Sequence, residues 1–372
     1  MLRLVALDLP GGPRFVESLR RAWDDGDAVL PLDQRLDLTR RRSVAERFGA
    51  SVVVDDDGST HIPDGTPVES GDALVVATSG STGEPKGVVL THDAVAASAA
   101  ATSRRLGVTR SDHWLACLPL AHVGGLSVVT RALHTGTMLT VHPGFDAHAV
   151  ETSGATLVSL VPTALLRIDP TRFRTIVLGG SRPPEVRPVN SVTTYGMTET
   201  GSGVVYDRVP LDGVDVRIVD GEIELRAPML LRCYRDGTDP RRAGGWFPTG
   251  DLGELGADGT LTVAGRRGDL IISGGENVWP EPVEAVLAGA AGVADVAVVG
   301  RPDPEWGDIV VAVVVPTDDT HPPALQDLRE HVKRSLPAFC APRAVEYRGS
   351  IPRTALGKIR RSALAPGPGP TV

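Results

Sequence analysis

Short blocks of apolar residues alternate with polar and glycine-rich stretches along much of the chain. Apolar runs lie at 73–77, 115–118, 156–161 and 175–178, and each is followed by a loop and a helix-compatible segment. Short apolar runs bounded by turn residues predict buried strands. Strands that alternate with helices predict a layered α/β domain, in which ligands collect at the carboxyl ends of the strands.

The pattern changes after about Asp212. Strand-like runs at 214–219, 222–226 and 260–263, separated by Asp-Gly turns, predict a smaller β-rich subdomain that completes the large domain. We therefore assign residues 1–267 to a large α/β N-terminal domain.

A second change follows Gly268. We predict a helix over 280–288, strands near 294–299 and 309–315, and a last strand over 344–347. A further helix is predicted because apolar residues recur at the spacing of one helical face, at Leu325, Leu328, Val332 and Leu336. Residues 268–372 are thus predicted to form a small α+β domain, which a hinge joins to the large one.

Composition and charge narrow the class of protein. The 372 residues suffice for two domains of about 150 residues each. The formal net charge of -8 argues against a nucleic-acid-binding protein, which needs a basic surface. We see neither a signal peptide nor a run of the roughly 18 apolar residues that a membrane span needs. These features predict a cytosolic protein without nucleic acid or membrane as a partner.

The cysteines fit the same compartment. Cys117, Cys233 and Cys340 are too far apart for a metal knuckle and too few for a disulfide framework. We interpret all three as small apolar fillers in a reducing environment.

Arginine supplies almost all of the positive charge. Of 38 basic side chains, only Lys86, Lys333 and Lys358 are lysines. A remaining lysine is therefore a candidate for a task that the wide, planar guanidinium does not suit, although Lys333 is interpreted as a surface residue. Four arginines between 40 and 47 are interleaved with acidic and apolar residues, which favours a solvated helix face.

The sharpest chemical signal is the segment Thr78-Ser79-Gly80-Ser81-Thr82-Gly83-Glu84-Pro85-Lys86-Gly87, directly after an apolar run. Its hydroxyl and glycine positions offer O–H and N–H donors without bulk, as the binding of a polyphosphate requires, and Lys86 adds a compact positive charge. It is not a Walker loop, because Pro85 precedes the lysine and Gly87 follows it. A flexible surface turn is the alternative, and the apolar strands on both sides disfavour it.

This loop resembles the phosphate loop of the adenylate-forming superfamily, which contains acyl-CoA synthetases, luciferases and peptide-synthetase adenylation domains. Further segments match the motifs of that family in the family's order, at 179–181, 195–201, 245–252, 265–277 and 352–359. Each motif alone could be an ordinary turn. Their common order over residues 78 to 358 makes the resemblance specific.

The resemblance implies an AMP-forming ligase that uses ATP, Mg²⁺ and a thiol, in most relatives CoA. Tyr195 would pack on adenine, Thr198 would reach the α-phosphate, Glu199 would hold Mg²⁺, and Asp251 would bind the ribose. Lys358 would be the adenylation lysine. The remaining nucleotide-binding residues implied by the family are Thr78, Ser79, Gly80, Ser81, Thr82, Gly83, Lys86, Gly180, Ser181, Gly196, Met197 and Arg266.

The family reaction has two halves. A carboxylate attacks the α-phosphorus of ATP, which yields an acyl-adenylate and pyrophosphate, and a thiol then displaces AMP. In the family, the small domain swings about a hinge between the two steps. Many relatives carry Asp or Lys at the hinge where this chain has Gly268, whose wide φ range keeps such a swing feasible.

The acid pocket is implied at residues 118–127, with His122 and Gly124, and at Gly201. His122 can donate to the substrate carboxylate. Arg131 either meets a second carboxylate or faces outward from its helix. Within the superfamily, the chain most resembles the compact actinobacterial o-succinylbenzoate:CoA ligases of menaquinone biosynthesis.

Two alternatives stay open at this point. Benzoate, halobenzoate and hydroxycinnamate CoA ligases share the histidine, and a carrier-protein-loading adenylation domain shares the nucleotide motifs. A homodimer is an expectation from the family alone, and residues 1–72 carry no signature that we can use.

Overall fold

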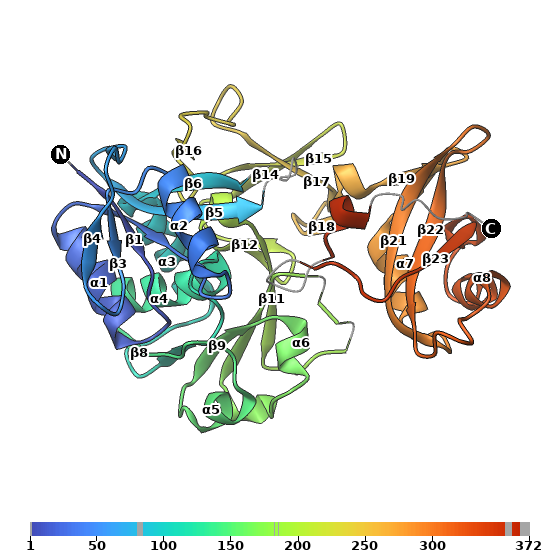
Figure 1. Ribbon diagram of the computed structural model, residues 1–372, viewed down its shortest axis with the longest axis horizontal. Coiled ribbons are helices and arrows are strands. Elements are labelled where there is room, and N and C mark those ends of the chain that lie inside the picture. Colours follow the sequence, from blue (N-terminus) through green and yellow to red (C-terminus); the bar gives the residue numbers. More distant parts are fainter. Residues whose placement is uncertain (1, 80–84, 182, 185, 354–358, 365–372) are drawn as a thin grey trace. The chain divides into compact units, whose positions relative to one another are not determined.

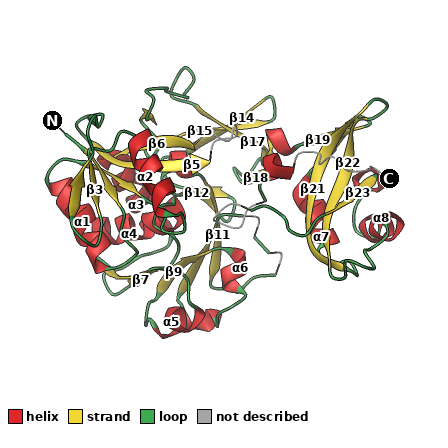
Figure 2. Cartoon of the chain, in the orientation of Figure 1, coloured by secondary structure: helices red, strands yellow, loops and turns green. Residues whose placement is uncertain are grey.

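The computed structural model describes residues 2–79, 85–181, 183–184, 186–353 and 359–364, and the chain divides into two compact units (Figure 1). The first unit comprises Met1–Arg217, Glu224–Pro248 and Leu255–Leu261, and the second comprises Ile218–Ile223, Thr249–Glu254 and Thr262–Val372. Helices and strands occur in both units (Figure 2), so the predicted mixed α/β class is confirmed.

Two seven-stranded sheets form the frame of the first unit. One has the order β16-β6-β5-β2-β1-β3-β4, and the other has the order β13-β12-β11-β10-β9-β7-β8. The strands of the first sheet are β1 (Leu4–Leu7), β2 (Ala28–Pro31), β3 (Val52–Val54), β4 (Ser59–His61), β5 (Asp72–Ser79), β6 (Pro85–Thr91) and β16 (Cys233–Tyr234). Those of the second are β7 (His113–Ala116), β8 (Met138–Val141), β9 (Leu157–Leu160), β10 (Thr175–Leu178), β11 (Ser191–Gly196), β12 (Gly203–Tyr206) and β13 (Val209–Pro210).

Helices α3 (His92–Arg105) and α4 (Val123–Thr135) lie between these sheets. α3 packs on β5, β6 and β12, α4 packs on β7, β8 and β9, and the two helices pack on each other. The other helices of this unit are α1 (Pro13–Asp24), α2 (Leu38–Arg47), α5 (Ala147–Thr152) and α6 (Pro162–Leu165), with short 3₁₀ turns at Pro170–Arg172 and Thr198–Thr200. The centre of the unit is therefore a helical layer, and the carboxyl ends of the parallel strands lead into the loops beside it.

A four-stranded sheet follows in the order β14-β15-β17-β18, formed by β14 (Asp215–Val219), β15 (Glu222–Arg226), β17 (Phe247–Leu255) and β18 (Leu261–Arg266). It corresponds to the predicted β-rich segment.

The remainder of the second unit has one further sheet, in which β19 (Ile271–Ser273), β20 (Glu276–Val278), β21 (Val293–Asp303), β22 (Gly307–Pro316) and β23 (Ala344–Tyr347) take part. Its helices are α7 (Pro280–Leu287) and α8 (Leu325–Lys333), with 3₁₀ turns at Arg267–Asp269, Ala338–Cys340 and Arg361–Leu364. Alternate residues of β21 and β22 point to opposite faces. Val296 and Val298 pack with the helices, whereas Ala297 and Val299 pack with Ile351 and Leu364 on the other face.

Several smaller predictions can be compared with the structure. The three cysteines are buried and unpaired, as predicted. The arginines of α2 are exposed except Arg41, which pairs with Asp8 and is only 15% exposed, so the predicted solvated face does not include it. Among the described residues, no helix is long and apolar enough to cross a membrane.

Candidate active site

The segment predicted to bind phosphate joins the antiparallel strands β5 and β6, where Ser79 pairs with Pro85 and Thr78 with Lys86. A strand and not a helix follows the loop, in agreement with the absence of a Walker pattern. The Lys86 side chain is exposed, and its ammonium lies 4.7 Å from the centroid of the Tyr234 ring. Gly80, Ser81, Thr82 and Gly83 lie outside the described residues, so their part in the loop stays a prediction.

Tyr234 also contacts the residue predicted to hold Mg²⁺. Its hydroxyl donates to Glu199 Oε1 at 3.0 Å, and the backbone oxygen of Glu199 accepts from the Leu231 amide at 2.8 Å. One tyrosine therefore lies against both the predicted phosphate-loop lysine and the predicted metal ligand. The sequence analysis missed Tyr234, because no motif covers β16 and the contact joins residues far apart in the chain.

Hydrogen bonds of its own residues fix the turn that carries Glu199. The Thr200 side chain is fully buried, accepts from the Met197 amide at 3.0 Å and donates to the Ser202 oxygen at 2.6 Å. Gly201 has φ +67°, in the left-handed region that favours glycine. A Cβ at Gly196 would lie 2.2 Å from the Ser202 oxygen. The local structure thus favours glycine at both positions, in addition to any contact with a ligand.

The segments predicted to surround adenine lie at the ends of neighbouring strands. Gly180 and Ser181 follow β10, while Tyr195 and Gly196 end β11, and the two strands are parallel. Because the carboxyl ends of parallel strands meet at one edge of a sheet, the structure brings these segments together. Tyr195 and the nearby Thr198 are half-buried, so both keep surface that a ligand could contact.

The donor set suits Mg²⁺ held jointly by the protein and a polyphosphate. Among the described residues, no group of three or more His, Cys, Asp or Glu could hold a metal on its own. Mg²⁺ commonly binds through one or two carboxylates together with substrate phosphates and waters. The single carboxylate of Glu199 therefore fits that ion.

In the second unit, the predicted ribose ligand and its neighbour form an ion pair. Asp251 is 7% exposed, and its Oδ1 lies 2.9 Å from Arg266 Nε. Arg266 also donates from Nη1 to the Thr249 oxygen at 2.7 Å. Gly250, which lies between Thr249 and Asp251 in the sequence, has φ +74°, and its amide donates to the Glu222 carboxylate at 2.9 Å. Lys358, the predicted adenylation lysine, lies outside the described residues.

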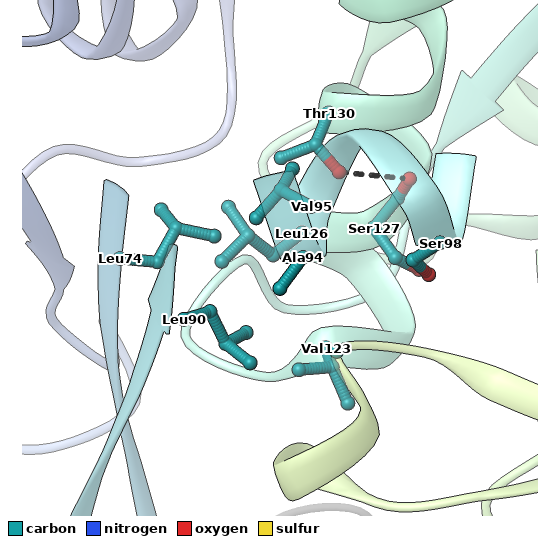
Figure 3. A pocket seen from close by; sticks show the side chains of 10 residues that line it. Leu74, Leu90, Ala94, Val95, Ser98, Val123, Leu126, Ser127 and Thr130 are labelled. Carbon is teal, nitrogen blue, oxygen red and sulfur yellow. Dashed lines mark hydrogen bonds between the residues drawn. The ribbon is translucent and has the colours of Figure 1, made fainter. Parts of the chain in front are cut away.

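A small apolar cavity lies between the β5–β6 hairpin, α3 and the start of α4 (Figure 3). Val123 and Gly201 both line it, so the two segments predicted to bind the acid adjoin each other. Its volume is about 10 Å³, room for one water, so the cavity alone is not an acid pocket. A Cβ at Gly124 would meet only a Leu118 methyl at 3.6 Å, which leaves open space at that position.

His122 precedes α4 and meets two residues from the N-terminal part of the chain. Arg35 Nη2 lies 2.8 Å from His122 Nε2, and Asp33 Oδ2 lies 3.5 Å from the same nitrogen. Asp33 and Arg35 belong to the loop between β2 and α2, for which the sequence offered no motif. The predicted pocket histidine is thus held from a part of the chain that had no assigned role.

Arg131 of α4 is buried, with 2% of its surface exposed, so the outward-facing alternative is wrong. Nη2 donates to Ser202 Oγ at 2.9 Å and Ser127 Oγ at 3.3 Å, and the guanidinium lies 4.8 Å from the Trp114 ring centroid. Nε and Nη1 have no hydrogen-bond partner among the described residues, and no carboxylate of a described residue pairs with Arg131. Burial lowers the pKa of Arg131 from its ordinary value.

Comparison with known proteins identifies relatives of this chain. The family profile "AMP-binding enzyme" matches residues 57–234, and "AMP-binding enzyme C-terminal domain" matches residues 282–358. The "Probable 2-succinylbenzoate--CoA ligase" of Mycobacterium tuberculosis is 40% identical in an alignment of 331 residues that covers 81% of this chain and 85% of that protein.

Solved structures agree with the sequence comparison. The o-succinylbenzoate CoA synthetase (MenE) from Bacillus subtilis in complex with OSB-AMP is 28% identical, with a TM-score of 0.86 over 98% of this chain and 88% of that one. The same enzyme in complex with ATP and magnesium ion gives a TM-score of 0.84 at 28% identity, over 97% and 89% of the two chains.

Proposed function

The chain belongs to the AMP-binding enzyme family, and on that premise we propose that it is an AMP-forming acid:CoA ligase that activates o-succinylbenzoate. In this function, ATP and the acid yield an acyl-adenylate and pyrophosphate, and CoA then displaces AMP, in menaquinone biosynthesis. Family membership agrees with the resemblance drawn from the motifs. The substrate follows the names of relatives that match most of the chain.

The observation that carries the choice of acid is the buried Arg131. o-Succinylbenzoate has two carboxylates, one that reacts and one that does not. A buried cation without a carboxylate partner among the described residues is what a second carboxylate would neutralise. Benzoate and coumarate lack that second group, so they would leave the charge of Arg131 without a counter-ion.

For the first half-reaction, we assign the neutralisation of the phosphate charge to Lys86 and to the Mg²⁺ that Glu199 would hold. The Lys86 ammonium binds phosphate oxygens, and Glu199 holds Mg²⁺, which when bound neutralises developing negative charge. We assign adenine binding to Tyr195, Gly180 and Ser181. We assign phosphate binding to Gly196, Met197, Thr198 and the loop 78–83. Thr198 reaches the α-phosphate.

For the rest of the reaction, Asp251 binds the ribose hydroxyls with Arg266 beside it. Lys358 stabilises the attacking carboxylate and the α-phosphate. His122, Gly124 and Gly201 bind the acid. Residues 1–267 and 268–372 act as the fixed and the moving domain about Gly268. We further propose a cytoplasmic location and a homodimer, both on the strength of the family.

The test is a panel of acids in pyrophosphate release, followed by mass analysis after addition of CoA. We expect strong preference for o-succinylbenzoate over benzoate, halobenzoates and coumarate, and a soluble CoA thioester as product. Preference for a monocarboxylate would overturn the choice of acid and leave the ligase standing. Adenylate formation without a CoA thioester would favour a carrier protein as the acceptor.

A further inference from the structure

The loop after β2 holds the Arg35 guanidinium in a fixed orientation. Asp33 accepts from Arg35 Nε at 2.8 Å and from Arg35 Nη2 at 2.7 Å, as a two-point fork. It also accepts from the Arg35 amide at 3.1 Å. A bidentate carboxylate–guanidinium pair fixes the plane of the guanidinium as well as its position. Burial acts to raise the pKa of Asp33, but the contacts that it makes, those with Arg35 among them, outweigh this effect and hold that pKa well below its ordinary value.

The same guanidinium determines the protonation of His122. Arginine carries only donors, so at 2.8 Å its Nη2 donates and His122 Nε2 accepts. The proton of the neutral ring then resides on Nδ1. Asp33 lies farther from Nε2, at 3.5 Å, and would pair with it only if that nitrogen carried a proton. A proton there would break the shorter Arg35 contact, and in a ring that also kept its Nδ1 proton it would place two cations side by side.

His122 Nδ1 is left available by this arrangement. The residue occupies the position before α4, yet its side chain makes no capping hydrogen bond. Its ring contacts within the described part of the chain are those of Nε2 with Arg35 and Asp33. The His122 side chain is 26% exposed, so part of it stays open to a ligand.

We propose that Arg35, oriented by Asp33, is a positioning residue that holds His122 as the neutral Nδ1–H tautomer, with this N–H directed to the substrate carboxylate. This rests on the proposed function for the identity of the substrate. The tautomer itself is a property of the free protein. The pair thus gives residues 28–37 a role in acid activation that no motif in them indicates.

The tautomer can be measured without turnover. In protein labelled with ¹⁵N-histidine, protonated and unprotonated ring nitrogens have well-separated chemical shifts, and the His122→Gln variant identifies the His122 signals. We expect a protonated Nδ1 and an unprotonated Nε2 at neutral pH in the wild type, and loss of this fixed form in Arg35→Met. A wild-type ring protonated at Nε2 would overturn the proposal, whatever the enzyme turns over.

Kinetics test whether Arg35 acts through His122. We expect Arg35→Met to lower kcat/KM for the acid about ten- to hundred-fold, the worth of a hydrogen bond to a charged group. The KM for ATP should stay near its wild-type value. In a His122→Gln background, Arg35→Met should have little further effect, because both changes remove one unit. Fully additive losses would overturn the proposal.

A matched control and a second variant complete the experiment. Arg42→Met is the same substitution at an exposed arginine of α2, paired with Glu46 at 3.1 Å, and should keep activity and the His122 tautomer. Should Arg35→Met not fold, Asp33→Asn weakens the fork and should release the tautomer in part. An unchanged tautomer in Asp33→Asn would refute the orienting role of Asp33. If wild-type protein releases no pyrophosphate with o-succinylbenzoate, the proposed function fails while the tautomer result stands.

Discussion

Replacement of Arg131 by methionine is the sharpest test of the acid specificity. Arg131 is 2% exposed, and two of its guanidinium nitrogens have no partner among the described residues. Methionine is unbranched and apolar, so it keeps the contacts of the aliphatic part of the side chain without the charge. We expect Arg131→Met to lower kcat/KM for o-succinylbenzoate by two to three orders of magnitude, because loss of one partner of a buried ion pair costs about 3–5 kcal/mol. Turnover of benzoate, which has no second carboxylate, should change little.

The stability of the free protein gives an independent magnitude. Replacing buried ionic groups by apolar ones of similar volume is neutral or stabilising by about 1–4 kcal/mol, and loss of the contact with Trp114 removes about 2 kcal/mol. The net change in unfolding free energy then lies between about -2 and +2 kcal/mol. A purely structural, well-satisfied arginine would instead lose several kcal/mol.

Two assays decide the matter. Pyrophosphate release with each acid gives the specificity ratio, and urea unfolding followed by circular dichroism gives the stability. Arg105→Met is the matched control, since Arg105 is exposed on α3 and donates to the Tyr206 oxygen at 3.1 Å. Equal losses with o-succinylbenzoate and benzoate, or a destabilisation well beyond 2 kcal/mol, would refute the reasoning.

Three further predictions concern other parts of the molecule. Tyr234→Phe keeps the ring near Lys86 and removes the hydrogen bond to Glu199. We therefore expect a roughly tenfold or greater rise in the KM for Mg·ATP, measured at varied Mg²⁺. An unchanged KM would contradict this expectation. Lys358→Ala should abolish pyrophosphate release while ATP still binds in calorimetry, and persistent release would refute the assigned role of this lysine. Burial raises the pKa of Cys117 to about 12, so its thiolate is scarce at pH 8. The thiol should resist Ellman's reagent in native protein and react in urea, and rapid native reaction would show that it is accessible.

The elements that the sequence predicted best are short apolar runs closed by turns. The strands at 175–178, 222–226 and 344–347 have the predicted ends. The hairpin of β21 and β22 extends beyond its predicted apolar parts, to Asp303 and from Gly307. Its ends are held by backbone pairing between the strands, and a hydropathy pattern carries no trace of that pairing.

Contacts between distant segments explain what the sequence did not predict about the site. The motifs named Lys86 and Glu199, but the tyrosine between them comes from a strand with no motif. Arg35 and His122 are 87 positions apart in the chain. Their contact depends on how two sheets pack around a helical layer, and neither local periodicity nor a family motif contains that information.

The burial of Arg131 could not be read from its own helix. The polar residues of α4 recur at the spacing of one helical face, and they are Ser127, Thr130, Arg131, His134 and Thr135. Such a face is typical of a helix whose polar side turns to solvent, which is the outward-facing alternative. The structure instead buries α4 from Gly125 to Ala132, and α3 packs on it. An ionised side chain buried in this way is costly unless something compensates its charge. The case for a second carboxylate therefore rests on tertiary packing, which leaves Nε and Nη1 of Arg131 without partners among the described residues.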